Sequence, residues 1–218
     1  MKKITIIVLC ILAIFALGTN KIQGKSESLQ EDIASKIIRF HVIANSDSKS
    51  DQALKLKIRD KVIEYIQPKL KNSKNIEESR KIIRENDKEI IDIANKVIND
   101  NGFNYSVKTT LSNENFPIKT YGNITLPPGR YEAYRIIIGD GKGQNWWCVM
   151  FPPLCFVDIT KGEVSYKETE TEMKSVLSPE EYKMVNNQLD KSRNSDIKVK
   201  FKILEMLEML GNKKSQVK

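Results

Sequence analysis

The chain has 218 residues, 40% of them hydrophobic, and a formal charge of +8, which is enough for one domain with a buried core. This modest positive charge favours a weak attraction to an anionic membrane surface or an acidic partner. The sequence has no RNA-binding signature, zinc-finger spacing or basic stripe interleaved with aromatic residues, so we do not expect it to bind nucleic acid.

The amino terminus has the pattern of a leader for export. "MKK" is followed by an uncharged apolar run, "ITIIVLCILAIFALG", at residues 4–18. As a helix this run would be about 22 Å long, shorter than a hydrocarbon core of roughly 30 Å. Ala16 and Gly18 place small residues where signal peptidase cuts, so residues 1–18 are predicted to be a signal peptide. An uncleaved membrane anchor is the alternative, and both interpretations export the rest of the chain.

A tether, a strand and a helix are predicted next. Residues 19–35 are expected to form a flexible tether, and "KIIRFHVIAN" (36–45) has the β-branched and aromatic residues of a strand. "SDSKSD" supplies N-cap residues for a helix over "QALKLKIRDKVIEYIQ" (52–67), which we expect to end at Pro68. The apolar residues of this helix recur at every fourth position: Leu54, Ile58, Val62 and Ile66.

One further helix and several strands follow. Apolar residues at helical spacing predict a single helix from Ile76 to Asn99, with Gly102 as a left-handed C-cap. Alternating residues from Phe103 to Thr109 predict a half-buried strand. "FPIKTYGNITL" (116–126) and "RYEAYRIIIG" (130–139) are predicted to be strands joined by a turn at "PPG" (127–129).

The last part of the chain is more polar. The charged runs at 161–175 and 190–196 are predicted to be solvated linkers, and Ser178 to Glu181 has the residues of a helix capping box. "DIKVKFKILEMLEML" (196–210) is predicted to be a final helix, although its first half alternates like a strand. The predicted fold is a single α+β domain, with a mostly antiparallel sheet and packed helices at 36–160. A charged linker and C-terminal helices are expected at 161–218.

The sequence offers few groups for catalysis or metal binding. Its one histidine, His41, lies on a predicted strand, where histidine is more often a structural hydrogen-bonding residue than a catalyst. Cys148 has apolar neighbours, which raise the pKa of a thiol and keep it protonated. The loop "GDGKGQN" (139–145) lacks the Walker spacing and is better explained as a hairpin loop than as a phosphate site. We expect a protein that is not an enzyme, without metal, cofactor or small-molecule substrate; a hydrolase using Cys148 or His41 is the alternative.

The stretch "NWWCVMFPPLCFVD" (145–158) contains both tryptophans of the chain. Adjacent strand residues point to opposite faces, so we expect one of Trp146 and Trp147 to be buried and the other exposed. Pro152 and Pro153 cannot donate to a sheet ladder, which places this stretch at an edge. We therefore predict that Trp146, Trp147, Phe151, Pro152 and Pro153 contact a protein partner, with core packing as the alternative.

Two cysteines remain once the leader is removed. Cys148 and Cys155 are seven residues apart, and the proline pair between them is able to turn the chain back. In an exported protein they are candidates for a disulfide, and two buried free thiols are the alternative.

Three long stretches resemble the stage II sporulation protein R family of endospore-forming bacteria: "RFHVIANSDSKSDQALKLKIRD" (39–60), "YGNITLPPGRYEA" (121–133) and "YRIIIGDGKGQNWWCVMFPPLCFVD" (134–158). With the leader, the resemblance covers most of residues 1–158. It implies a signalling protein made in the forespore and delivered to the space between the forespore and mother-cell membranes. There it would bind and activate the membrane-embedded aspartic protease that removes the pro-sequence of sigma factor E. A membrane-anchored interaction module is the alternative.

We predict that the exported protein begins near Thr19, because the apolar run is short and Ala16 and Gly18 fit a cleavage site. Mass spectrometry or Edman sequencing of the exported form measures its amino terminus. An exported chain that still carries residues 1–18 would show an uncleaved anchor.

Overall fold

The computed structural model describes residues 28–156 and 163–187, so the predicted leader and the predicted helix at 196–210 lie outside the described residues. Residues 28–35 are helical. The elements that follow are β1 (Ile38–Ile43), α2 (Lys49–Leu70), α3 (Ile76–Glu85), α4 (Asp87–Asp100), β2 (Val107–Phe116), β3 (Lys119–Tyr121), β4 (Ile124–Leu126), β5 (Gly129–Ile138), β6 (Asn145–Phe151), the 3-10 helix η1 (Leu154–Phe156), α5 (Glu163–Val176) and α6 (Pro179–Val185). The predicted α+β single domain is confirmed.

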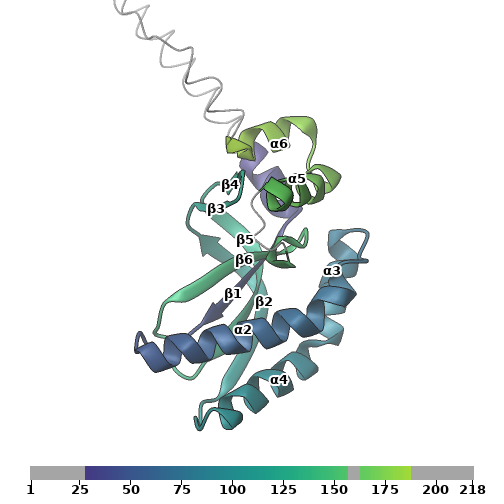
Figure 1. Cartoon of the computed structure of the whole chain (residues 1–218). Coiled ribbons are helices and arrows are strands. Elements are labelled where there is room, and N and C mark those ends of the chain that lie inside the picture. Colours follow the sequence, from purple (N-terminus) through teal and green to yellow (C-terminus); the bar gives the residue numbers. More distant parts are fainter. Residues whose placement is uncertain (1–27, 157–162, 188–218) are drawn as a thin grey trace, which may run out of the picture. The chain divides into compact units, whose positions relative to one another are not determined.

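The main sheet has four strands in the order β2-β5-β1-β6, with β1 beside β5 at its centre (Figure 1). β1 is parallel to β5 and antiparallel to β6, and β2 is antiparallel to β5. β3 and β4 form a separate two-stranded sheet. The turn at 127–129 joins β4 to β5 as predicted, but these two strands do not pair, because β5 enters the main sheet. β2 begins at Val107, later than predicted, and continues to Phe116.

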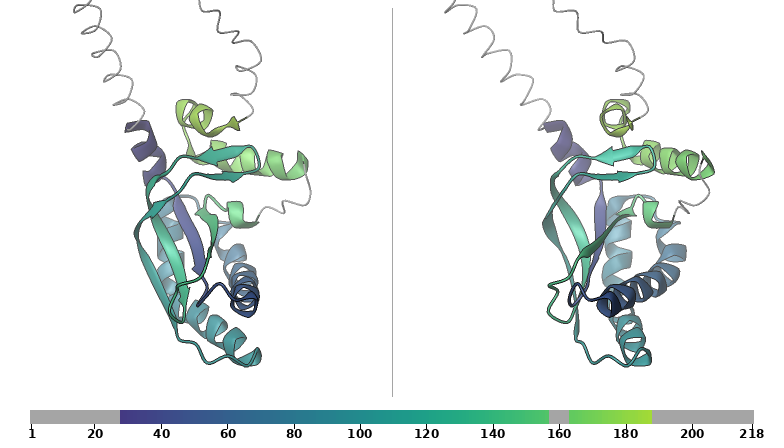
Figure 2. Two further views of the ribbon diagram at one scale, coloured as in Figure 1. Left: turned by 90° about the vertical axis from the view of Figure 1, so that its left-hand side faces the viewer. Right: turned by 60° about the vertical axis from the view of Figure 1, so that its left-hand side comes forward.

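Two apolar clusters cover the two faces of this sheet. Helices α2, α3 and α4 cover one face, and the helical segment 28–35, the β3–β4 pair, α5 and α6 gather at the upper end of the sheet in Figure 2, where their side chains form the second cluster with residues of the other face. The first cluster includes Phe40, Val42, Leu54, Ile58, Val62, Ile90, Tyr134, Ile136 and Met150. The second includes Ile33, Ile37, Phe116, Ile124, Tyr131, Val149, Met173, Tyr182 and Val185.

The predicted tether and linker are wrong for part of their length. Ile33 and Met173 are completely buried in the second cluster, so residues 28–35 and helix α5 belong to the folded domain. The sequence interpretation relied on the many charged residues around α5 and overlooked its narrow buried stripe. The predicted capping box of α6 is confirmed, because Ser178 N donates to Glu181 Oε2 at 2.6 Å. Lys36 Nζ lies 2.7 Å from the Glu181 carboxylate, which joins the start of β1 to α6.

Helix α2 and the region after it differ from the prediction at two points. Pro68 lies inside the last turn of α2, which ends at Leu70 instead. The single helix predicted from Ile76 to Asn99 is two helices, α3 and α4, that meet at Asn86. The Asn86 side chain donates to the carbonyl of Ile82 at 2.7 Å and accepts from the Tyr65 hydroxyl at 2.6 Å, which holds the break in place. The predicted C-cap is confirmed, since Gly102 has a φ of +76°.

The glycine-rich loop at 139–145 is not a hairpin, because it crosses over β1 to join β5 to β6. Asp140 N donates to the Asn45 side-chain oxygen at 3.0 Å, and Gln144 N donates to Asp47 Oδ1 at 2.7 Å. These side chains already use the amides that would bind a phosphate. Gly143 packs so tightly that a Cβ would lie 2.2 Å from the Ser46 carbonyl oxygen. The loop is therefore a structural connection.

Candidate functional site

Strand β6 is one edge of the main sheet and carries both tryptophans. Trp146 packs on the first cluster, against the edge of the Phe40 ring at a centroid distance of 5.8 Å. Trp147 packs on the second cluster, so the predicted opposite facing is confirmed. Neither ring is fully buried or fully exposed, and the predicted contrast in burial is wrong. A cation lies over each ring: Arg59 is 4.9 Å from the centroid of Trp146, and Lys119 Nζ is 5.5 Å from that of Trp147.

Phe151 and Pro152, which we expected at the surface, are buried. Phe151 is the last residue of β6 and packs in the first cluster with 5% of its surface exposed. After it the chain turns inward, and Leu154 N donates to the carbonyl of Pro152 at 2.7 Å to begin η1. Pro153 is half-buried. The edge position predicted from the prolines is correct, but their exposure is not, because η1 folds back against the core.

Cys148 and Cys155 lie close together, and both are free thiols in the structure. Cys148 is buried in the first cluster, and Cys155 packs against that cluster and donates from Sγ to the carbonyl of Val149 at 2.9 Å. Burial and the neighbouring Cys148 thiol raise the pKa of Cys155 well above the usual value of a thiol. Cys155 is therefore protonated at neutral pH and is a poor nucleophile. The disulfide between them stays a prediction.

His41 is buried on the opposite face of the sheet from Cys148. In the register of β1 and β6, His41 is opposite Trp147 and Phe40 is opposite Cys148, so His41 and Cys148 belong to different clusters. The His41 ring stacks on Trp147 at 4.8 Å with an interplanar angle of 9°, and neither of its nitrogens has a hydrogen-bond partner among the described residues. Burial, followed by the charges of Arg135 and Arg39, lowers the pKa of His41 from 6.5 to about 4. A Cys148–His41 pair for catalysis is therefore not formed.

Arg39 is the feature that the sequence interpretation missed. Its side chain is completely buried beside His41, and Nη2 donates a hydrogen bond to the Tyr121 hydroxyl at 3.1 Å. The guanidinium carbon lies 4.4 Å from the ring centroid of Phe116 and 5.0 Å from that of Tyr131. The described residues supply no carboxylate within ion-pair distance of it. Arg39 is a charged residue in the mostly apolar stretch "IRFHVI" of β1, and this was the signal in the sequence that could have identified it.

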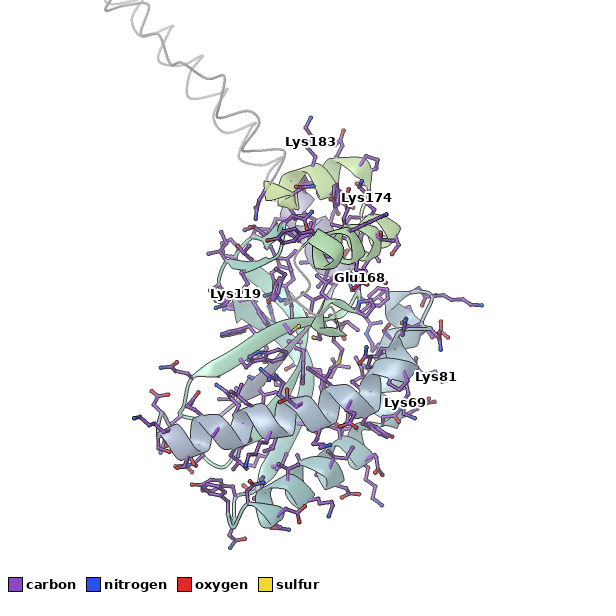
Figure 3. All side chains as sticks on the ribbon, viewed as in Figure 1. Lys69, Lys81, Lys119, Glu168, Lys174 and Lys183 are labelled. Carbon is purple, nitrogen blue, oxygen red and sulfur yellow. The ribbon has the colours of Figure 1, made fainter. Side chains whose placement is uncertain are left out.

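The surface beside Trp147 includes an exposed apolar residue. Ile118 is 61% exposed and lies between Phe116 and Lys119, both of which contact the Trp147 ring. We call Ile118, Lys119 and Trp147 the Trp147 surface. In the view of Figure 3, Lys119 lies on the left of the sheet, whereas Lys81 lies on α3 at the right. The surface is formed by Ile118 of the connection from β2 to β3, by the first residue of β3 and by β6, which the sequence alone could not bring together.

A metal site and a membrane-spanning helix are two further features to consider in the described residues. They contain no group of three or more histidine, cysteine or acidic residues arranged to hold a metal ion. Among them, no helix is both long enough and apolar enough to cross a membrane. The groups gathered at the Trp147 surface are aromatic, aliphatic and cationic.

Comparisons with known proteins agree on one family. The sequence model of the stage II sporulation protein R (spore_II_R) family matches residues 34–161. The stage II sporulation protein R of Bacillus subtilis (strain 168) is 37% identical over 224 residues, which cover 96% of this chain and 99% of that protein. No solved structure matches the chain.

The two tryptophans should contribute similarly to stability. Because both rings are half-buried and packed against a cluster, Trp146→Ala and Trp147→Ala should each lower the free energy of unfolding by roughly 2–4 kcal/mol. Ile118→Ala is the control and should change it by less than about 0.5 kcal/mol. Urea denaturation measures all three. A variant that loses either tryptophan without losing stability would contradict the packing described.

His41 should make the stability depend on pH. Its pKa is about 4 in the folded protein and near 6.5 when unfolded, so the unfolded state takes up the proton first as the pH falls. The contribution of the neutral ring is complete above pH 6.5 and declines by about 3 kcal/mol as the pH falls towards 4. His41→Phe should remove this part of the pH dependence, measured by urea denaturation between pH 7.5 and 4.5. Parallel curves for the two proteins would exclude a buried neutral His41.

Proposed function

Because this chain belongs to the stage II sporulation protein R family, we propose that it is an exported signalling protein that activates a membrane-embedded aspartic protease by binding it. This protease would be the one that processes the pro-form of sigma factor E. The place of action would be the space between the forespore and mother-cell membranes. A role in sporulation follows from the family itself.

The observation that carries the binding role is the Trp147 surface. The strongly exposed Ile118 directly precedes Lys119 in the chain, and Lys119 Nζ lies over the half-buried ring of Trp147 on β6. Aromatic residues that are partly buried and rigidly held are typical of the residues that dominate binding energy at protein interfaces. Lys119 adds a positive charge that would favour an acidic patch on the partner. The buried Phe151 and Pro152 are no longer part of this contact surface.

Activation by binding needs a difference in affinity between two states of the protease. A ligand that binds the active state more tightly shifts the population towards that state, and equal affinity for both states shifts nothing. If the active protease is a dimer, a ligand that contacts both subunits would favour the dimer. This mechanism requires no chemical step from the chain described here.

The two alternative functions have weaker support. A hydrolase using Cys148 or His41 would need a nucleophile and a base at one site, and the sheet separates these two side chains. A membrane-anchored interaction module would use the same Trp147 surface and differ only in keeping residues 1–18. The net charge, which is +8 for the full chain and stays positive without Lys2 and Lys3 of the leader, would add a weak attraction to anionic membrane lipids in either form.

Co-expression tests the proposal directly. The full chain is produced with the protease and the pro-sigma substrate in a host that lacks all three, and processing of the substrate is followed by immunoblotting. We expect processing with the wild-type chain. Ile118→Glu should reduce it at least tenfold, because a charge replaces an apolar contact residue at an interface.

Leu56→Glu is the matched control. Leu56 is 38% exposed on α2, which packs on the face of the sheet opposite to the Trp147 surface. With Leu56→Glu, the protease should process the substrate as it does with the wild-type chain. The melting temperatures of Ile118→Glu and Leu56→Glu establish that both variants fold. No processing with the wild-type chain would reject activation by binding. Normal processing with Ile118→Glu would show that the contact with the protease lies on a surface other than the Trp147 surface.

A further inference from the structure

Strand β2 is an unusual edge. It runs for ten residues from Val107 to Phe116 and pairs with β5 along its whole length without a shift of register. It contains no proline, and no other strand of the described residues pairs with its outer side. Edge strands in monomeric proteins are usually short, bulged or interrupted, because their free backbone groups pair with other chains. The opposite edge, β6, does have a register shift, and its last residue, Phe151, directly precedes Pro152.

The hydrogen bonds with β5 determine which backbone groups of β2 point outward. Gly139 N donates to the carbonyl of Ser106 at 2.8 Å, which extends the ladder by one residue beyond Val107 and Ile138. In an antiparallel pair such bonded positions alternate, so the even-numbered residues of β2 use their backbone groups on β5. The odd-numbered residues direct N–H and C=O groups away from the sheet: Val107, Thr109, Leu111, Asn113 and Asn115.

We propose that two copies of this chain pair through β2, antiparallel, about a two-fold axis at Leu111. Leu111 then lies opposite Leu111 of the second copy, and the outward backbone groups of the odd-numbered residues bond one another. Lys108 of each copy lies opposite Glu114 of the other, so two ion pairs of opposite charge form across the axis. Thr110 lies opposite Ser112, which places hydroxyl groups side by side.

The alternation of hydrogen bonds restricts the choice of register. The register of β2 against β2 of the second copy can shift only in steps of two residues, since the outward N–H and C=O groups of one strand must meet those of the other. The neighbouring registers place Lys108 opposite Ser112 or Phe116, where it has no acidic partner. Glu114 is also held in position, because Arg135 Nη2 is 2.9 Å away and Ser112 Oγ donates to the same carboxylate oxygen at 2.8 Å. The register centred on Leu111 is therefore the one that matches charges.

The paired copies would form a continuous eight-stranded sheet from two four-stranded ones. The pairing involves the chain alone, so it does not depend on the proposed protease or on the Trp147 surface. It also gives the long edge of β2 a partner and thereby protects it from uncontrolled strand addition.

Reversal of charges tests the pairing and its register. The full chain is expressed with its leader and purified in the form that the host exports, and its mass is measured by sedimentation velocity at micromolar concentrations. The wild type should be a dimer. Lys108→Glu and Glu114→Lys should each weaken the dimer about tenfold, because each places like charges opposite each other twice. An equimolar mixture of the two variants should restore it, since both cross pairs are then of opposite charge.

Two further variants separate the pairing from general effects. Asn113→Pro removes an outward N–H group without removing a bond to β5, and it should give a folded monomer. Lys81→Glu makes the same change of net charge on α3 and should leave the dimer unchanged. A monomeric wild type would overturn the proposal. So would a dimer that neither Lys108→Glu nor Asn113→Pro weakens, since its interface would lie elsewhere.

Discussion

The double burial of β1 is the constraint on which the rest of the structure depends. β1 has a strand on each side and an apolar cluster on each face, so its alternating side chains all need packing partners. Phe40 and Val42 meet helices α2 to α4, as an amphipathic strand would. Arg39 and His41 point to the other face, where the rings of Phe116, Tyr121 and Tyr131 surround Arg39 and those of Phe116 and Trp147 pack on His41. A guanidinium stays charged at any physiological pH, so the aromatic rings around Arg39 and the Tyr121 hydroxyl replace part of its lost hydration.

The features of the fold that depend on local spacing could be predicted from the sequence. Those that depend on contacts between distant segments could not. The four-residue repeat of α2, the Gly102 cap and the capping box of α6 depend on neighbours along the chain, and the structure has all three. The break at Asn86 depends on Tyr65 of another helix, and the buried stripe of α5 depends on the β3–β4 pair. The opposite facing of the tryptophans followed from strand geometry alone. The cations over the two rings come from α2 and β3, and the sequence near the tryptophans carries no signal for them.

The candidate site shows the same division. Its strand β6 was identified from tryptophans and prolines, but Ile118 and Lys119, which complete the Trp147 surface, come from the β2–β3 connection and the start of β3. Phe151 and Pro152, which were expected to be exposed, are buried because η1 turns inward. The position of a turn decides here which residues of an aromatic stretch reach solvent, and composition carries no information on that. The surface is built on a rigid sheet edge, which limits the ordering cost of binding.

The parallel pairing of β1 with β5 has a consequence for the order of folding. Ile38 pairs with Glu132, and β6 on the other side of β1 comes still later in the chain. Contacts between residues so far apart in sequence form slowly, because a long loop must close before they contribute. During synthesis from the amino terminus, β1 therefore has no strand partner until β5 (129–138) has emerged and lacks its second partner until β6 (145–151) follows, while α2, α3 and α4 have all been made. The central strand is among the first elements to be synthesised, but its two neighbouring strands can join it only late in synthesis.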